Sequence, residues 1–167
     1  MPAIQVLGVF CDDVREEASG MHTLVGVYPD NLNVPPLPVA LAKLALYVRV
    51  AVDPHIDVLP MFLWLVPDKG EEKQVNAIDP ELVRRAQKEA RERGTPIATI
   101  MCRIIMAPFP IMDYGRVKAA LRTGDDEIIC ASLNFQPTPA PIPSLPIGLK
   151  PPAKRPRAAR LKKAPKP

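Results

Sequence analysis

The stretch Lys43–Val52, KLALYVRVAV, decides the fold class of this 167-residue chain. Aliphatic residues occupy every second position from Leu44 to Val52, and the positions between them include Tyr47 and Arg49. Because successive side chains of a strand point to opposite faces, this alternation predicts a β-strand with one buried face. Such a face needs a second layer to cover it, so the stretch predicts a layered β-protein.

Similar runs lie on both sides of this strand. Residues 3–11 and 21–28 are β-rich and are separated by the turn signal Ser19-Gly20, which predicts an antiparallel pair. Residues 58–66 are apolar on both faces, as in a central strand, and residues 97–107 form another long strand that ends before two prolines.

The clearest hairpin lies near residue 124. Residues 116–122 and 127–135 flank the turn Thr123-Gly124-Asp125. In the first strand, Val117, Ala119 and Leu121 are expected inside, with Ala120 and its charged neighbours outside. In the second strand, the alternation predicts a shared buried face that consists of Ile129, Ala131, Leu133 and Phe135.

One helix is predicted at about residues 80–93. Asp79 is a suitable N-cap, Pro80 suits the first helical position, and Gly94 suits the position after the last turn. Ion pairs are expected between Glu81 and Arg85 and between Glu89 and Arg93, since the members of each pair lie one helical turn apart. The apolar stripe of this helix is narrow, which predicts a helix on the surface of the fold.

About seven strands, one surface helix and short turns predict an all-β fold, an antiparallel β-sandwich. The segment Asn33–Pro38, NVPPLP, is predicted to be a crossover between the sheets or a protected edge, because its prolines lack N–H donors. We expect the folded domain to span residues 1–136, followed by a proline-rich linker at 137–149 and a basic, disordered tail at 150–167.

Charge is divided unevenly between the body and this tail. All 18 acidic residues and 14 of the 22 Lys and Arg residues precede Lys150, so that residues 1–149 carry a formal charge of −4 and the remainder carries +8. A segment of this kind is typical of an interaction arm that attracts a polyanion. The candidate polyanion-binding residues are Lys150, Lys154, Arg155, Arg157, Arg160, Lys162, Lys163 and Lys166.

The remaining composition predicts a cytoplasmic protein. The longest apolar run, residues 58–66, is too short to span a bilayer, and the N-terminal residues lack the basic start of a signal peptide. Cys11, Cys102 and Cys130 have no CxxC spacing and lie in or beside apolar runs, so we expect buried, reduced thiols.

Signals for chemistry are weak. Asp53, His55 and Asp57 form D-x-H-x-D, which could bind a divalent metal, and Asp12 and Asp13 could contribute further ligands if their loop lies beside it. The simpler interpretation is a polar turn around Pro54. No Gly-rich phosphate loop is present and no cofactor is predicted.

Four other residues have simple structural interpretations. His22 is expected on a solvent-facing strand, away from any Ser or Cys that would make it catalytic. Met101, Met106 and Met112 are expected to fill the core.

The N-terminal part of the chain resembles a family of small bacterial and phage proteins that is known only as a domain of unknown function. The resemblance rests on an acidic pair, a turn glycine, an LVGVY strand, a proline-bearing link and an alternating strand, here Cys11–Asp13, Gly20, Leu24–Tyr28, Pro35–Pro38 and Leu44–Val50. It covers about the first 135 residues and implies a compact β-sandwich. It implies no activity and no site residues, and the basic tail lies outside it.

Three functions are consistent with these features. The first is a non-enzymatic binding or scaffold protein whose basic arm attaches, without sequence preference, to nucleic acid or another anionic partner. The second is a phage-derived structural subunit that assembles as a homo-oligomer. The third is a metal-dependent enzyme or binder that uses the D-x-H-x-D residues. No small-molecule ligand can be named from the sequence.

Overall fold

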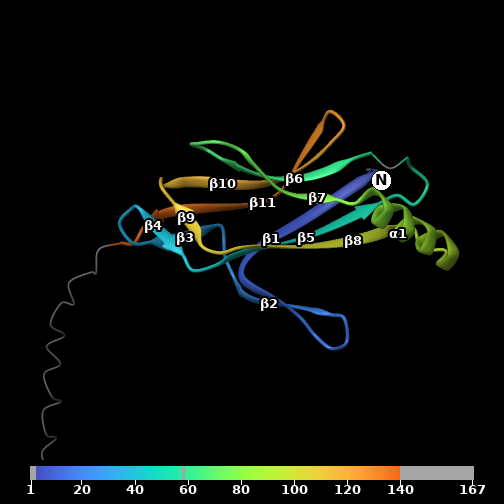
Figure 1. Ribbon diagram of the computed structural model, residues 1–167, viewed down its shortest axis with the longest axis horizontal. Coiled ribbons are helices and arrows are strands. Elements are labelled where there is room, and N and C mark those ends of the chain that lie inside the picture. Colours follow the sequence, from blue (N-terminus) through green and yellow to red (C-terminus); the bar gives the residue numbers. More distant parts are fainter. Residues whose placement is uncertain (1–2, 58, 140–167) are drawn as a thin grey trace, which may run out of the picture.

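A computed structural model describes residues 3–57 and 59–139 of the protein (Figure 1). These residues form eleven strands and one helix: β1 (Ile4–Glu16), β2 (His22–Val27), β3 (Asn31–Val34), β4 (Val39–Leu41), β5 (Leu44–Val52), β6 (Met61–Pro67), β7 (Lys73–Ile78), α1 (Pro80–Arg93), β8 (Ala98–Met106), β9 (Phe109–Ile111), β10 (Gly115–Thr123) and β11 (Asp126–Pro137). The predicted all-β sandwich is confirmed. The seven predicted strands correspond to β1, β2, β5, β6, β8, β10 and β11. The four missed strands are β3, β4 and β9, which have three or four residues, and β7, which has six.

Two sheets form the layers of the sandwich. One has the order β2-β1-β5-β8, and the other has the order β3-β11-β10-β6-β7. A small third sheet, β4-β9, lies at one end of the molecule, and α1 lies at the other (Figure 1). The strand pairs are antiparallel, as predicted, except for the edge pair of β3 with β11, which is parallel.

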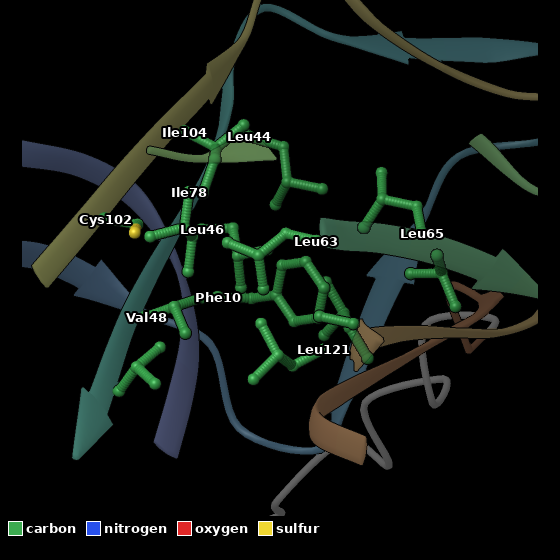
Figure 2. Close-up of a cluster of buried hydrophobic side chains, with 14 of the residues drawn as sticks. Phe10, Leu44, Leu46, Val48, Leu63, Leu65, Ile78, Cys102, Ile104 and Leu121 are labelled. Carbon is green, nitrogen blue, oxygen red and sulfur yellow. The ribbon is translucent and has the colours of Figure 1, made fainter. Parts of the chain in front are cut away.

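The core lies between the sheets, as the alternation in β5 requires. Its five inward residues, Leu44 to Val52 at every second position, have no exposed surface. They meet Phe10 of β1, Leu63 of β6 and Leu121 of β10 (Figure 2). Burial of each such side chain stabilises the fold by about 1.5–3 kcal/mol, which explains why one apolar face per strand is enough to hold the layers together.

The helix begins and ends where the sequence predicts. Asp79 accepts a hydrogen bond from the backbone N–H of Glu81 at 2.9 Å, and Gly94 adopts the left-handed conformation (φ 65°). The ion pairs differ in part from the prediction: Glu89 contacts Arg93 at 3.7 Å, but Glu81 contacts Arg84 rather than Arg85. Three and four residues are equivalent separations on a helical surface, so spacing alone could not choose between them.

A β-bulge changes the predicted faces of the last hairpin. The register between β10 and β11 shifts between Ala119 and Ala120, and Cys130 is the extra residue. Leu133 is buried as predicted, but Ile129 is 48% exposed, because the bulge reverses the alternation that precedes it. Ala120 was expected outside and is fully buried between its cross-strand neighbours.

The folded body extends slightly beyond the predicted boundary at residue 136. Strand β11 continues to Pro137, and the backbone N–H and Oγ1 of Thr138 both donate to the carbonyl oxygen of Val34, at 3.0 and 3.1 Å. Most of the predicted linker and the whole predicted tail, including the eight basic candidates from Lys150 to Lys166, lie outside the described residues.

Candidate functional site

A cavity of about 390 Å³ is lined in part by β9. Strand β9 lies at the end of the sandwich opposite α1 (Figure 1). It is enclosed by the turn between β6 and β7, by the segment from Met106 to Val117 that includes β9, and by Phe135 of β11. Ligand pockets commonly occupy about 300–1,000 Å³, so its volume is that of a small-molecule or short-peptide site.

Local chemistry explains why the sheets do not close over this end. Pro108 directly precedes the short strand β9 and Pro110 is its central residue, and a proline without an N–H cannot continue a long ladder. The end of β6 is tied to β10 instead: the N–H of Asp68 donates to the carbonyl of Arg116 at 2.8 Å, and the N–H of Arg116 donates to Oδ2 of Asp68 at 3.2 Å.

The lining of the cavity is mainly apolar. Phe109 and Phe135 lie 6.1 Å apart in a tilted aromatic pair, and Tyr114 adds a third ring. Met106 and Met112 supply flexible thioethers that can adapt to different shapes. The prediction that all three candidate methionines fill the core is wrong, because Met112 is 67% exposed at this cavity and Met101 is 49% exposed on the outer face of β8.

Charged side chains lie at the rim of the cavity. Lys69, Lys73 and Arg116 are the cations, and Glu71 and Asp113 are the acids. None of them takes part in the ion pairs found among residues 3–57 and 59–139. The described lining contains no His, Cys, Ser or Thr. The lining therefore combines apolar surface with point charges at the rim.

The D-x-H-x-D residues have a structural role. Oδ1 of Asp53 accepts a hydrogen bond from the backbone N–H of His55 at 2.8 Å, the geometry of a polar turn. Nε2 of Gln87, on α1, donates to the carbonyl oxygens of Asp53 and Ile56, each at 3.0 Å. Within the part of the chain that the structure describes, no group of three or more His, Cys, Asp and Glu could hold a metal ion.

Asp12 and Asp13 lie far from that turn and have other partners. The N–H of Asp53 donates to Ala3, so about nine residues of β1, or roughly 30 Å, separate the turn from Asp12. The Tyr28 hydroxyl donates a hydrogen bond to the Asp12 carboxylate. Burial of the Tyr28 side chain, together with this hydrogen bond, raises the pKa of Tyr28 to about 12. Lys43 contacts Asp13 at 2.8 Å, and its hydrogen bond lowers the pKa of that carboxyl.

Histidine 22 is half-buried rather than solvent-facing. Its ring meets Tyr47 edge-on at 5.6 Å, and its Nδ1 is buried without a hydrogen-bond partner among the described residues. Leu24 of β2 and Tyr47 of β5 pack against a second small core of Cys11, Val14 and Ala45. The alternation of β2 alone could not reveal this second layer of contacts.

The cysteines are free thiols, as expected. Cys11 and Cys102 are buried and Cys130 is partly buried. Burial raises the pKa of the Cys102 thiol and raises that of Cys130 to about 11. Thiols with raised pKa values are poor nucleophiles at neutral pH, so these cysteines have the properties of packing residues.

The sequence predictions missed the cavity. Its lining comes from three separated segments, and only the run APFPIMDYG at residues 107–115 gave a signal: apolar residues and prolines that do not alternate. Only its prolines entered the sequence prediction, as the residues that end the strand at 97–107. Its assembly into a cavity depends on β6, β7 and β11, which are distant in the sequence.

Fold and cavity together define a β-sandwich protein with an apolar, ligand-sized cavity at the open end of its core. The chain belongs to the family of unknown function DUF6941, whose model matches residues 6–136. The resemblance to a domain of unknown function over about 135 residues is therefore confirmed. No curated protein and no solved structure matches the chain. Within the described residues, α1 is too short and too polar to cross a membrane.

Proposed function

We propose that this chain is a non-enzymatic binding protein of the bacterial cytoplasm, in which a basic arm at residues 150–167 attaches the sandwich to nucleic acid or another anionic partner. The observation that carries the proposal is the separation of charge: eight Lys or Arg residues and no acid after residue 149, against a net charge of −4 before it. An arm of one sign beside a body of the other sign directs a polyanion to the arm.

The composition of the arm indicates how it binds. It contains no aromatic residue on which a base could stack. Its contacts are therefore with phosphates, and each neutralised phosphate releases counterions. If half of the eight charges engage, the logarithm of the binding constant falls with the logarithm of salt with a slope of about −3 to −4.

Half of the body's cations, seven of the 14 Lys and Arg residues before Lys150, already face acidic side chains. Arg15, Lys43, Arg103 and Arg122 each lie within 4 Å of an acidic side chain. On α1, Arg84, Lys88 and Arg93 do the same. Cations that already face carboxylates contribute little net attraction to a polyanion. The free thiols are consistent with a reducing compartment.

The test replaces the eight basic arm residues with Gln in the full chain. Binding to labelled single-stranded and duplex DNA of unrelated sequences is measured by fluorescence anisotropy from 50 to 300 mM salt. We expect loss of binding in the variant, and equal affinity and a steep salt slope for all sequences in the wild type. The matched control replaces four cations of α1 with Gln, at positions 84, 85, 88 and 93, and should bind like the wild type. Undiminished binding by the arm variant contradicts the proposal.

A second candidate function is a subunit of an assembly such as a phage particle, which one surface favours. The outer face of the β2-β1-β5-β8 sheet exposes Leu7 by 62%, Met101 by 49% and Ile105 by 48%. Exposed apolar residues that gather on one face mark an interaction surface. Light scattering over a concentration series tests this function, since a wild-type oligomer that Leu7→Lys dissociates would support it and a monomer at all concentrations would exclude it.

A further inference from the structure

The apolar cavity lies beside the point where the described chain leaves the sandwich. Phe135 lines the cavity and pairs with Gly115, which also lines it. Three residues later, Thr138 is fixed to Val34 by two hydrogen bonds, and Pro139 is the last described residue before position 140. Whatever follows Pro139 therefore starts within a few residues of the cavity.

The next ten residues have the composition of a ligand for such a cavity. Residues 140–149, APIPSLPIGL, contain three prolines and four Ile or Leu residues. They contain no charged residue, and their only polar side chain is that of Ser144. Prolines at this density favour polyproline II, which has three residues per turn. Ile142 and Leu145 then lie on one edge, whereas Ile147 lies on another.

The cavity has the surface that such segments recognise. Proline-rich chains dock into grooves lined by aromatic rings, because a stiff, preformed helix loses little entropy on binding. Here Phe109, Tyr114 and Phe135 supply the rings, and Pro67, Pro108 and Pro110 supply flat apolar surface between them. A volume of about 390 Å³ accommodates two aliphatic side chains and part of their backbone.

The length of the segment and its attachment favour its own chain as the occupant. In polyproline II, ten residues span about 31 Å, which is ample for a return from Pro139 to the neighbouring rim. A tether this short gives an effective concentration of about a millimolar, so a contact with a dissociation constant well below a millimolar would be largely formed.

We propose that residues 140–149 occupy the apolar cavity of the same chain, with Ile142 and Leu145 inserted among the aromatic residues. This contact goes beyond the proposed function and does not depend on it, because the basic residues that follow take no part in it. Its consequence is a fixed exit for the arm at the β9 end of the sandwich, away from α1.

Methionine methyl resonances of the full chain test the proposal. Met106 and Met112 line the cavity, and Met101 lies on the outer face of β8 and serves as the internal reference. Leu145→Asp should shift the Met106 and Met112 signals and leave Met101 in place. The matched variant Ile147→Asp changes a side chain on another edge of the segment and should leave all three close to their wild-type positions.

A peptide of residues 140–149 distinguishes the origin of any shift. Added to the Leu145→Asp chain at millimolar concentration, it should return Met106 and Met112 toward the wild-type positions, whereas the wild-type chain should not respond. The proposal is overturned if Leu145→Asp leaves both signals unchanged, or if Ile147→Asp shifts them as strongly. It is also overturned if the wild-type positions depend on protein concentration, which would identify a second copy as the occupant.

Discussion

Gly8 on β1 and Ala131 on β11 bring the two sheets into close approach: a Cβ on Gly8 would lie 3.1 Å from the Cβ of Ala131 and 3.1 Å from Sγ of Cys130. Real Cβ contacts are rarely this short. The two strands belong to different sheets, so this pair of residues closes one side of the sandwich. The absence of a side chain at position 8 is what allows the approach.

Replacement of Gly8 by Val should therefore destabilise the protein. Overpacking of a tight interior site costs about 1–3 kcal/mol, and we expect a loss of this size in the free energy of unfolding measured with urea. Gln5→Val, at an exposed position of the same strand, is the matched control and should change stability by less than about 0.5 kcal/mol. Equal stability of the two variants would show that the sheets can separate at no cost.

Gly26 gives a second test of close packing, in the hairpin of β1 and β2. It has a φ of +62°, and a Cβ there would lie 2.0 Å from Oδ2 of Asp12. Gly20 has a similar φ of +78° with nothing within 4 Å. Gly20→Ala should cost about 1–2 kcal/mol from backbone strain alone. Gly26→Ala should cost at least about 1 kcal/mol more, because Asp12 must also move.

Thermal or urea unfolding of the two alanine variants measures this difference. Asp12→Ala combined with Gly26→Ala should recover the part of the loss that comes from crowding, leaving the strain. If both glycine variants lose the same stability, the carboxylate of Asp12 is not held over Gly26.

The pH dependence of stability should report on Tyr28. Burial and the Asp12 carboxylate raise its pKa from 10.0 to about 12. A raised pKa in the folded state means that the contribution of Tyr28 is complete below pH 10 and is lost as the pH rises from 10 toward 12. Tyr28→Phe should remove this part of the alkaline loss, so that the stability of the variant falls less steeply than that of the wild type between pH 10 and 12.

Unfolding free energies at pH 8, 10 and 11.5 provide the measurement. Tyr114→Phe, at an exposed tyrosine of the cavity, is the control and should retain the alkaline slope of the wild type. A Tyr28→Phe variant with an unchanged slope would mean that the Asp12 contact does not persist in solution.

Gln87 should be essential to the junction between α1 and the turn after β5. It is only 3% exposed and donates to the carbonyls of Asp53 and Ile56. Gln87→Leu keeps the volume but leaves both acceptors without this donor, which should cost about 1–3 kcal/mol. The exposed Gln74→Leu on β7 is the control. Faster amide exchange of residues 53–57 in the Gln87 variant alone would localise the effect to this turn.

The accuracy of the sequence predictions differs from one element of the fold to the next. The alternation of β5 predicted a strand with one buried face, and Asp79 and Gly94 predicted both ends of the helix, because these signals depend only on neighbouring residues. The face of Ile129 was predicted wrongly, because the bulge at Cys130 arises from pairing with β10. Short strands such as β4 and β9 were missed, because three residues are too few to show the two-residue alternation of a strand.

For the candidate site, sequence reasoning pointed first to the basic residues from Lys150 to Lys166, which lie outside the described residues, and more weakly to the D-x-H-x-D pattern, but not to the cavity. Asp53, His55 and Asp57 attract attention as a local pattern, yet the hydrogen bonds of Asp53 serve its own turn. The residues that line the cavity form no motif in the sequence. Their arrangement appears only in the fold, where residues distant in the chain, such as Phe109 and Phe135, come into contact.

The sequence by itself determined the layers, the helix and the division of charge between body and arm, because hydrophobic periodicity, capping and charge counts are properties of consecutive residues. Tertiary structure alone decided which strand edges meet at Gly8, where the sheets remain open and which apolar side chains surround the cavity. These features depend on side chains brought together from distant parts of the chain, and no periodicity records which residues will become neighbours.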